Sequence, residues 1–362
     1  MRSYSPVHID FNTCKCCETF YSKVNYIVNR ISGMTNPYTG NKRNIIPTML
    51  NLLEKENIEY DSVLDLFSGS AYVSMAMKYM GKNVISNDIL LSSYYYAKAF
   101  VENDFMKISE EQKDYLLNNE NKDRSSFVEE NFHNRFTDNE AKFLDNFHAN
   151  AKNLDNDYAE ALAFSNMQMY IEDRCFLGGR LNNGQIIAEL DFRISHNRNK
   201  GFEMPFTNMR WYSFVDDFNT VTCCKSFCED SIELLESGNV GVDLAYIDPP
   251  YGGQQSDYGF MYNFLESYVR QQLPEKWPTA QHMKRFVKKD DYEDNFIEMI
   301  ELVSDIPVLV VSYNNSSWSE IDHIKEILFR HRDEVQAIEV NYDYNYRDKK
   351  NKSGVEYLII AR

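Results

Sequence analysis

The stretch that decides the fold is SVLDLFSGSAYVSMAMKYMGKNVISND, residues 62–88. It holds two short apolar runs, at residues 62–67 and 83–88, with apolar residues at helical spacing between them. Short apolar runs of this kind are typical of parallel strands that are buried on both faces. A turn of small residues, 68–70, joins the first run to the helix. The stretch therefore predicts a strand, a tight turn, a helix and a second strand, which is the unit of an α/β sheet.

The remainder of the chain continues this alternation. Three more apolar runs predict strands, and two final runs separated by a short loop predict a terminal antiparallel hairpin. Helical patterns precede the first strand and follow the first and fifth. We therefore expect an α/β fold with a Rossmann-like, doubly wound sheet. The later strands are expected at residues 220–227, 242–248, 306–313, 335–344 and 355–361, and the helices at 43–56, 73–81 and 319–331.

One long region breaks the alternation. Residues 91–209 are mostly helical in pattern, and the helical spacing is clearest at 140–154 and 158–173. This region is too long for a single crossover connection, so we interpret it as an inserted helical subdomain. The expected organisation is an N-terminal extension at 1–36, a sheet domain at 37–90 and 216–362, the helical insertion at 91–215 and a second insertion at 252–298.

Composition narrows the class of protein. The chain has 362 residues, 43% of them hydrophobic, and its net charge of -17 argues against a protein that coats nucleic acid non-specifically. It has no run of eighteen apolar residues and no apolar h-region at its start, so we expect neither a membrane span nor a signal peptide. We interpret the seven cysteines as reduced thiols of a cytoplasmic protein. The CKCC of residues 14–17 lacks a second pair at zinc-type spacing, so we expect no metal site.

Acidic residues stand at the ends of the first two predicted strands. Asp65 precedes a turn in which Gly69 lets a ligand approach the backbone at a helix N-terminus. Asp88 comes nineteen residues after Gly69, and an acid at about this spacing can accept hydrogen bonds from ribose hydroxyls. The alternatives are an ordinary strand–turn–helix connection and an aspartate that caps the following helix.

A later predicted strand ends in AYIDPPYGG, residues 245–253. Asp248 can accept a hydrogen bond from an amino group. Proline fixes φ and has no N–H, so Pro249 and Pro250 stiffen the loop and hold its carbonyls outward as further acceptors. Tyr251 offers a flat face on which a base can stack. Together these residues predict a pocket for a planar ring that carries an exocyclic amine.

The chain resembles the Dam-like adenine-N6 DNA methyltransferases with the alpha arrangement of motifs, because four separated motifs occur in that family's order. They are YTGNK at 38–42, DLFSGS at 65–70, the acid at 88 and DPPY at 248–251. The resemblance is closer to methyltransferases of asymmetric-site restriction–modification systems, through DLFSGSA and VISND, VVSYNN at 310–315 and KSGVEYLI at 352–359. It covers about residues 37–89 and 218–361 and implies that the sheet domain is a methyltransferase catalytic domain.

The resemblance implies S-adenosylmethionine as the cofactor. Tyr38 and Lys42 would lie near its adenosine and methionine ends, and Asp88 would hold its ribose. Asp230 stands where the family has an acid near the cofactor's adenine, but Ser231 replaces the phenylalanine that usually follows. Ala71 also stands near the place of a usual second glycine of the turn, so we expect altered geometry with binding retained. The implied cofactor-binding residues are Tyr38, Lys42, Asp65, Phe67, Gly69, Ser70, Asp88 and Asp230.

The same resemblance implies a role for DPPY in catalysis. The Asp248 carboxylate and the Pro249 carbonyl would accept hydrogen bonds from the two N–H groups of an adenine amine. This would free the nitrogen lone pair to attack a methyl group. The base must leave the duplex to be reached, and the Tyr251 ring would stack on it. The implied catalytic residues are Asp248, Pro249, Pro250 and Tyr251.

Basic residues cluster locally despite the net charge. The run FRISHNRNKGF, residues 192–202, mixes arginine and lysine with asparagine, which suits phosphates and base edges. Further clusters lie at 282–289 and 347–352, and the alternative for each cluster is a solvated face. We expect double-stranded DNA as the substrate, a cognate restriction endonuclease as a possible partner, and DNA contacts from Arg193, Asn197, Arg198 and Lys200.

Other activities stay open at this point. The DPPY motif also occurs in enzymes that methylate RNA adenine or protein glutamine, whereas cytosine-N4 enzymes usually have serine in place of Asp248. A protein that binds nucleic acid without catalysis can keep the same fold. The early Tyr38 motif and the long insertion favour DNA, so we expect a site-specific adenine-N6 DNA methyltransferase in the cytoplasm, associated with the nucleoid when bound to DNA.

Overall fold

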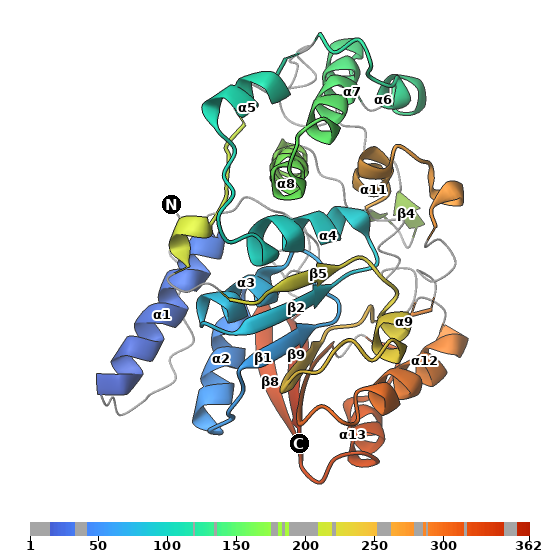
Figure 1. Cartoon of the computed structure of the whole chain (residues 1–362). Coiled ribbons are helices and arrows are strands. Elements are labelled where there is room, and N and C mark those ends of the chain that lie inside the picture. Colours follow the sequence, from blue (N-terminus) through green and yellow to red (C-terminus); the bar gives the residue numbers. More distant parts are fainter. Residues whose placement is uncertain are drawn as a thin grey trace.

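The computed structural model describes most of the chain (Figure 1). The described residues are 15–32, 42–118, 120–133, 136–174, 180–182, 185–187, 209–218, 222–251, 262–278, 285–286, 289–314, 317–343 and 353–362. They form a seven-stranded sheet with helices on both faces, a layer of helices beyond one edge of the sheet, and a separate two-stranded sheet. Within these residues, no helix has the length and apolar character that crossing a membrane requires.

The seven strands have the order β5-β2-β1-β6-β7-β9-β8. The first five of these pair in parallel, whereas β9 is antiparallel to both β7 and β8. The predicted α/β sheet with a terminal antiparallel hairpin is therefore confirmed. The bounds are β1 Ser62–Asp65, β2 Asn83–Asn87, β5 Lys225–Phe227, β6 Leu244–Ile247, β7 Val308–Asn314, β8 Val335–Asp343 and β9 Ser353–Ala361.

The strand order reverses at β1. The chain passes from β1 to β2 on one side, and β6 later pairs with the other side of β1. In open α/β sheets a crevice forms at such a switch point, outside the carboxyl ends of the strands. The residues that follow β1 and β6 therefore face a common crevice.

Alternation along the strands divides the apolar side chains between two cores. In β1, Val63 belongs to the first core and Leu64 to the second; in β6, Tyr246 belongs to the first and Ile247 to the second. The first core also holds apolar residues of α1 (Lys15–Ser32), α2 (Ile46–Lys55) and α3 (Tyr72–Tyr79). The second holds those of α9 (Ser231–Glu236), α12 (Lys289–Leu302) and α13 (Ile321–Phe329).

Between β2 and β5 the chain is mostly helical, as predicted. α4 lies next to β2 and β5, and α5 to α8 lie beyond it (Figure 1). The expected helices at 140–154 and 158–173 are α7 and α8, and α7 begins at a capping box in which Thr137 and Glu140 bond to each other's backbone N–H. The bounds are α4 Leu91–Ala97, η1 Lys98–Glu102, α5 Glu110–Leu116, α6 Phe127–Asn131, α7 Asp138–Lys152, α8 Asp157–Arg174, β3 Arg180–Asn182, β4 Gln185–Ile187 and η5 Val215–Asp217.

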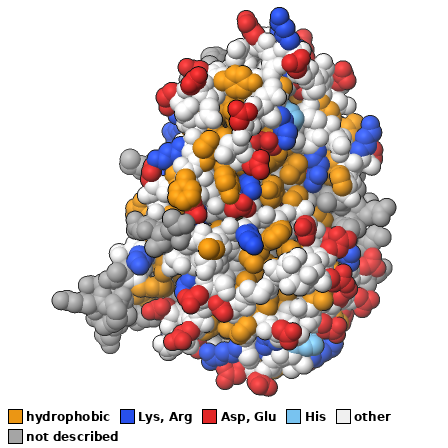
Figure 2. All heavy atoms as spheres, in the orientation of Figure 1, with side chains coloured by type: hydrophobic (Ala, Val, Ile, Leu, Met, Phe, Trp, Pro, Cys, Tyr) orange, Lys and Arg blue, Asp and Glu red, His pale blue; other side chains and the backbone are white. Residues whose placement is uncertain are grey.

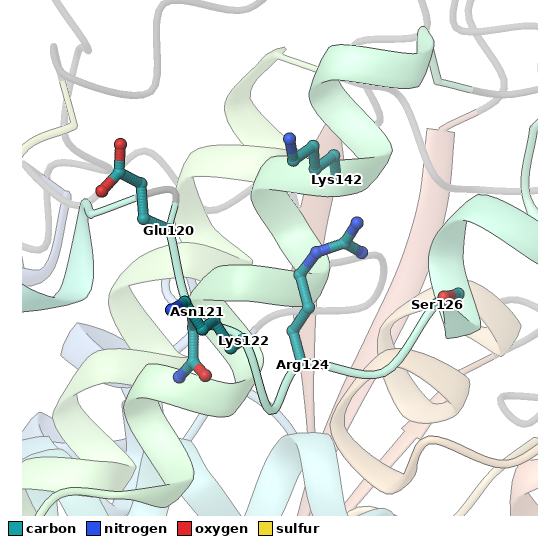
Figure 3. Close-up of a pocket in the computed structure, with 6 residues that line it drawn as sticks. All are labelled: Glu120, Asn121, Lys122, Arg124, Ser126 and Lys142. Carbon is teal, nitrogen blue, oxygen red and sulfur yellow. The ribbon is translucent and has the colours of Figure 1, made fainter.

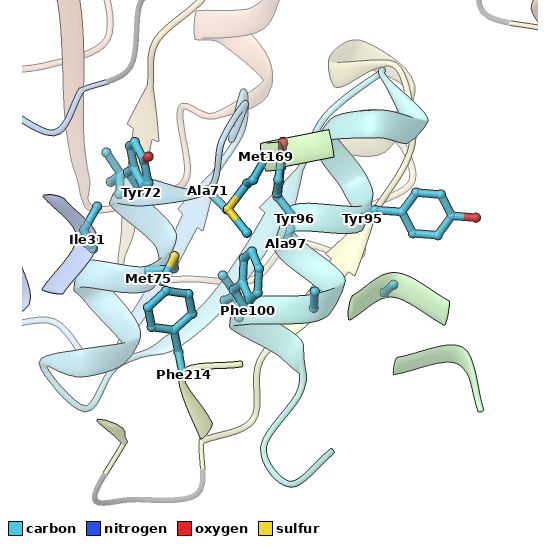
Figure 4. Close-up of a cluster of buried hydrophobic side chains, with 14 of the residues drawn as sticks. Ile31, Ala71, Tyr72, Met75, Tyr95, Tyr96, Ala97, Phe100, Met169 and Phe214 are labelled. Atoms are coloured by element: carbon cyan, nitrogen blue, oxygen red, sulfur yellow. The ribbon is translucent and has the colours of Figure 1, made fainter. Parts of the chain in front are cut away.

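The helical region shares the first core with the sheet. Figure 4 shows Met75 of α3, Tyr96 of α4, Phe100 of η1 and Met169 of α8 packed together. All four side chains are buried. The helices are therefore held against the sheet by one continuous apolar core.

The segment after β6 also docks on this region. It contains α11 (Asn263–Arg270) and the 3₁₀ turn η7 (Pro274–Lys276). The fully buried carboxylate of Glu266 accepts hydrogen bonds from Leu91 N at 2.9 Å and Ser92 N at 2.8 Å. An acid at a helix N-terminus satisfies free N–H groups, so α11 fixes the start of α4.

One predicted strand is shorter than expected. The run at 220–227 forms a strand only over Lys225–Phe227. Immediately before it, side chains take the place of ladder bonds: Val84 N donates to Cys224 Sγ at 3.4 Å, and Cys223 N donates to Asn83 Oδ1 at 2.9 Å. These bonds satisfy backbone groups that a longer strand would have paired.

Candidate active site

The crevice side of the sheet collects polar residues on the face of the first core. Asp65 pairs in register with Tyr246, and Asn314 at the end of β7 pairs with Glu356 of β9. Asp248 follows Tyr246 by two residues. Side chains two residues apart in a strand point the same way, so the carboxylates of Asp65, Asp248 and Glu356 share this face.

Asp248 lies in a compact cluster of side chains. Its Oδ1 accepts a hydrogen bond from the Tyr251 hydroxyl at 2.7 Å and pairs with Lys42 Nζ at 3.2 Å. Lys42 Nζ also donates to the Tyr251 hydroxyl, and to Glu356 Oε1 at 3.2 Å. The side chains of Lys42, Asp248 and Glu356 are 6%, 15% and 5% exposed. The cluster is therefore largely shielded from water, and Asp248 is its most accessible charged member.

The second oxygen of Asp248 is the open position of this cluster. Within the described part of the chain, both partners of Asp248 bind Oδ1, and no hydrogen bond reaches Oδ2. Burial raises the pKa of Asp248 to about 6, Lys42 opposes this rise, and the Glu356 carboxylate adds to it. Near neutral pH the carboxylate is ionised, so Oδ2 can accept a hydrogen bond from an amino group.

The Tyr251 ring is held from several sides. It meets the Tyr313 ring edge-on at 6.3 Å between centroids, and Lys42 Nζ lies 4.8 Å from its centroid. Its backbone carbonyl accepts a hydrogen bond from Trp318 N at 3.1 Å. The loop of Pro249 and Pro250 is thus tied to the loop after β7, which limits where the ring can move.

Asp65 is bound differently from Asp248. Its Oδ2 accepts hydrogen bonds from Ser74 Oγ at 2.6 Å and Ser74 N at 3.1 Å, which fixes the first turn of α3. Its Oδ1 is buried without a hydrogen-bond partner among the described residues, as is the Ser68 Oγ. Burial, with repulsion from Asp248, raises the pKa of Asp65 to about 7. Buried polar atoms usually have partners, so these two atoms are suited to bind a ligand.

The turn after β1 is joined to the loop after β2 through Asp88. Asp88 Oδ2 accepts from Gly69 N at 2.8 Å, and Oδ1 accepts from Leu90 N at 2.9 Å. Burial raises the pKa of Asp88 to about 6. Gly69 has φ +50° and Ala71 has φ +59°, so the turn contains two left-handed residues. The left-handed region favours glycine, so Ala71 holds a conformation that an L-residue with a Cβ adopts at a cost of about 1–2 kcal/mol.

A family model for D12 class N6 adenine-specific DNA methyltransferases matches residues 38–180, which include Lys42, Asp65, Gly69 and Asp88. Over these residues the chain is similar to this family. The match ends before DPPY, so the cluster around Asp248 rests on the structure and on longer alignments with individual relatives.

Three relatives show how far the similarity extends along the chain. The type II methyltransferase M2.HphI of Haemophilus parahaemolyticus is 28% identical over 92% of this chain and 95% of its own length. The type II methyltransferase M.FokI of Planomicrobium okeanokoites is 26% identical, with 87% of this chain covering 50% of the relative. The modification methylase StsI of Streptococcus sanguinis is 26% identical, with 80% covering 46%. The chain spans nearly the whole of the first relative and about half of the other two.

Asp230 caps a helix. Its Oδ1 accepts hydrogen bonds from Ile232 N at 3.1 Å and Glu233 N at 3.3 Å at the start of α9. Its Oδ2 lies 3.3 Å from Arg285 Nε, and Phe286 meets the ring of Phe67 edge-on at 5.5 Å. Residues of the second insertion therefore contact both Asp230 and Phe67. The basic cluster at 282–289 was the only sequence signal for this contact.

Glu356 and Arg285 are the polar side chains that sequence reasoning did not place at the site. For Glu356 the available signal was a single acid inside the apolar run of β9. Ser70 is buried at the turn, and its contact with a cofactor stays a prediction. The other predicted contacts lie outside the described residues; they are Tyr38, Arg193, Asn197, Arg198 and Lys200.

A separate open hollow lies in the helical region (Figure 3). It is lined by Glu120, Asn121, Lys122, Arg124, Ser126 and Lys142, from α7 and the segment before α6. Arg124 pairs with Glu129, so part of its positive charge is already balanced. This hollow contains none of the residues of the strand-end cluster.

Proposed function

We propose that this methyltransferase transfers the methyl group of S-adenosylmethionine to the N6 amino group of an adenine flipped out of duplex DNA at a specific site. The observation that supports this most strongly is the arrangement of Asp248. One of its oxygens is held by Tyr251 and Lys42, and the other has no hydrogen bond from a described residue. A carboxylate held in this way is preorganised to accept a hydrogen bond from a substrate amine.

The chemistry follows from the properties of the amine. Its lone pair is delocalised into the adenine ring, so it is a weak nucleophile. Asp248 Oδ2 and the Pro249 carbonyl accept hydrogen bonds from its two N–H groups, and the nitrogen lone pair becomes available for attack. The negative charge of Asp248 stabilises the positive charge that grows on nitrogen, and orientation of the reactants contributes up to about 7–11 kcal/mol in favourable systems. When bound, S-adenosylmethionine would supply an electrophilic methyl group. Its methyl–sulfur bond would break as the nitrogen–methyl bond forms, the neutral thioether would leave, and the methylated amine would release one proton to solvent.

The target base reaches this pocket only outside the helix stack. Flipping a base costs a few kcal/mol, and stacking on an aromatic ring returns about 1–3 kcal/mol. Tyr251 supplies this ring. Its hydroxyl and backbone are already fixed by Asp248, Lys42 and Trp318, so little further ordering is needed when the base arrives.

The residues at the ends of β1 and β2 fit the cofactor. The unpartnered Asp65 Oδ1 and Ser68 Oγ suit its amino and hydroxyl groups. The Gly69 turn allows close approach of the backbone, and Phe67 with Phe286 supplies an aromatic wall for a purine. Asp88 keeps its predicted contact with the ribose only if an oxygen already bonded to Gly69 N or Leu90 N accepts a further hydrogen bond.

Recognition of DNA is assigned to the helical insertion at 91–215 and to its basic run at 192–202, with 1–36 as an N-terminal extension and 252–298 as a second insertion beside the active site. Figure 2 shows acidic side chains gathered at the lower right of that view, where α12 lies in Figure 1. Acidic side chains also lie over the helical region at the top of that view, so the DNA contacts are assigned to the local basic runs. The proposed partner is a cognate restriction endonuclease. The proposed location is the cytoplasm, where the protein would associate with the nucleoid when bound to DNA.

The proposal is tested with purified protein and S-adenosylmethionine carrying a tritiated methyl group, offered with duplex DNA, RNA and protein. We expect label in DNA alone, as N6-methyladenine after hydrolysis. Calorimetry measures cofactor binding separately. Label in RNA or protein, or cofactor binding without transfer to any substrate, contradicts the proposal.

A further inference from the structure

Glu356 is a buried acid within an apolar strand. Its neighbours in β9 include Leu358, Ile359 and Ile360, all buried, and its own side chain is 5% exposed. A carboxylate in such a place is costly unless a cation or hydrogen-bond donors compensate its charge. Lys42, at 3.2 Å, is such a cation.

Lys42 connects Glu356 to the acceptor of the methyl-transfer site. Its ammonium contacts Glu356 Oε1, Asp248 Oδ1 and the Tyr251 hydroxyl. Its backbone carbonyl accepts hydrogen bonds from Ile45 N at 3.0 Å and Ile46 N at 3.2 Å, so it is anchored at the start of α2. Glu356 is anchored in the sheet on the other side. The ammonium is therefore held between two fixed elements.

The charges of the cluster explain why a second acid is useful. Lys42 with Asp248 alone forms a neutral pair, which weakens the stabilisation by Asp248 of the positive charge that grows on the attacking nitrogen. Two carboxylates around one ammonium give a net charge of about -1 when both are ionised. Among the described residues, the other titratable groups near Asp248 are Tyr246, Tyr251 and Asp65, and the two tyrosines are neutral because burial raises their pKa far above neutrality.

We propose that Glu356 is a positioning residue for methyl transfer: it holds the Lys42 ammonium and balances its charge, so that Asp248 meets the target amine as a net negative acceptor. This inference rests on the proposed role of Asp248. It differs from a purely structural role, in which Glu356 only compensates a buried lysine and leaves the ionisation of Asp248 unchanged.

The first test is the pH profile of Glu356→Gln. Unmethylated plasmid DNA is the substrate, and single-turnover transfer is followed from pH 5 to pH 8. Removing the nearby negative charge lowers the pKa of Asp248, so the acid limb moves to lower pH by about 0.5–1 unit. The rate at neutral pH falls by about tenfold, as expected for a loss of interaction worth one pKa unit. Cofactor affinity, measured by calorimetry, stays within about threefold, because a threefold change is under 1 kcal/mol.

The matched control is Glu339→Gln. Glu339 lies on β8 of the same hairpin, paired in register with Tyr357, and is exposed to solvent. We expect its rate and its acid limb to match those of the original protein. The inference is overturned if the acid limb of the pH–rate profile is at the same pH in Glu356→Gln and in the original protein, provided that the original protein methylates the plasmid. Absence of transfer by the original protein instead contradicts the proposed function.

A double variant keeps the test usable if Glu356→Gln folds poorly. Lys42→Met with Glu356→Gln removes both buried charges together, which is less destabilising than leaving one unpaired. If the uncompensated ammonium causes the defect, the double variant transfers methyl at least as fast as Glu356→Gln, or measurably where that variant is unfolded. It is also no slower than Lys42→Met. The inference is overturned if the rate losses of the two single variants multiply in the double variant. It is also overturned if the double variant is folded and binds the cofactor but transfers no methyl group.

Discussion

The two halves of the carboxyl edge of the sheet use acids in different ways. On the half formed by β1, β2 and β5, the acids accept hydrogen bonds from backbone N–H groups; they are Asp65, Asp88 and Asp230. On the half formed by β6, β7 and β9, Asp248 and Glu356 are bound by the side chains of Lys42 and Tyr251. In the sequence Asp65, Asp88 and Asp248 look alike, since each stands at the end of an apolar run.

The type of hydrogen-bond donor indicates what each acid is suited to do. Bonds to backbone amides fix the shape of a loop, and they persist when a ligand binds because the loop depends on them. Contacts between side chains can adjust as a substrate enters. We therefore expect changes on the first half to alter stability and cofactor binding, and changes on the second half to alter the rate of methyl transfer.

The largest expected effect is that of Asp248→Asn. The substitution keeps the size of the side chain but removes the charge that stabilises the attacking nitrogen. Single-turnover methyl transfer should fall by about 10²–10³-fold, the range seen when one preorganised electrostatic contact to a transition state is lost. Cofactor affinity, measured by calorimetry, should stay within severalfold. A methyl-transfer rate of Asp248→Asn within threefold of the original protein would contradict the proposed difference between the two halves.

The pH dependence of the rate is the next largest effect. The pKa of Asp248 is raised to about 6, so its proton is bound below that pH and lost above it. Only the ionised form has the negative charge that stabilises the attacking nitrogen and an Oδ2 without a proton, so the rate should fall about tenfold per unit below pH 6 and reach a plateau above it. Intrinsic fluorescence recorded at each pH verifies that the protein stays folded. A rate that rises as the pH falls below 6 contradicts this role of Asp248.

Asp88→Asn probes the other half. An amide has a single acceptor oxygen, and its NH₂ group faces either Gly69 N or Leu90 N, so one backbone N–H loses its partner. The free energy of unfolding should fall by about 1–3 kcal/mol in denaturant titrations, and cofactor affinity should fall with it. Asp61→Asn is the control, because the Asp61 side chain is 98% exposed. Unchanged stability and affinity in Asp88→Asn sink the claim that Asp88 fixes both loops.

The smallest expected effect is that of Tyr251→Phe. The ring that stacks on the base is kept, and the hydroxyl that donates to Asp248 Oδ1 and accepts from Lys42 Nζ is lost. Lys42 keeps its contacts with Asp248 and Glu356, so we expect the lost bond to Asp248 to determine the change in rate. One hydrogen bond is worth about 0.5–1.5 kcal/mol, so transfer should slow by about 2- to 10-fold. Tyr251→Ala also removes the ring and should be slower than Tyr251→Phe on duplex DNA. Equal rates for these two variants exclude stacking by Tyr251.

Local patterns were enough to predict the sheet and the position of Asp248 after a strand. The alternation of apolar runs and helices predicts the order of the elements, and the DPPY stretch predicts Asp248 at a strand end. Both depend on residues that are close in sequence. The shortened β5 was not predictable in this way, because Cys223 and Cys224 bond to Asn83 and Val84 across 140 residues.

The partners of the strand-end acids were equally hidden from the sequence. Asp88 fits both a ribose contact and a capping role by spacing, and only the bonds from Gly69 N and Leu90 N show that its oxygens are already used. Glu356 lies 314 residues from Lys42 in the chain, and no local pattern reports their contact. Such long-range pairs depend on the register of β9 against β7, which the hairpin and the core set together.

The most direct test is single-molecule sequencing of DNA from cells that express the protein or its Asp248→Asn variant. It reads modified adenines at every sequence at once, so the recognition site need not be known beforehand. We expect N6-methyladenine at one recurrent sequence with the original protein and none at that sequence with the variant. Equal methylation by both proteins would show that the Asp248 carboxylate is not the acceptor on which the chemistry depends.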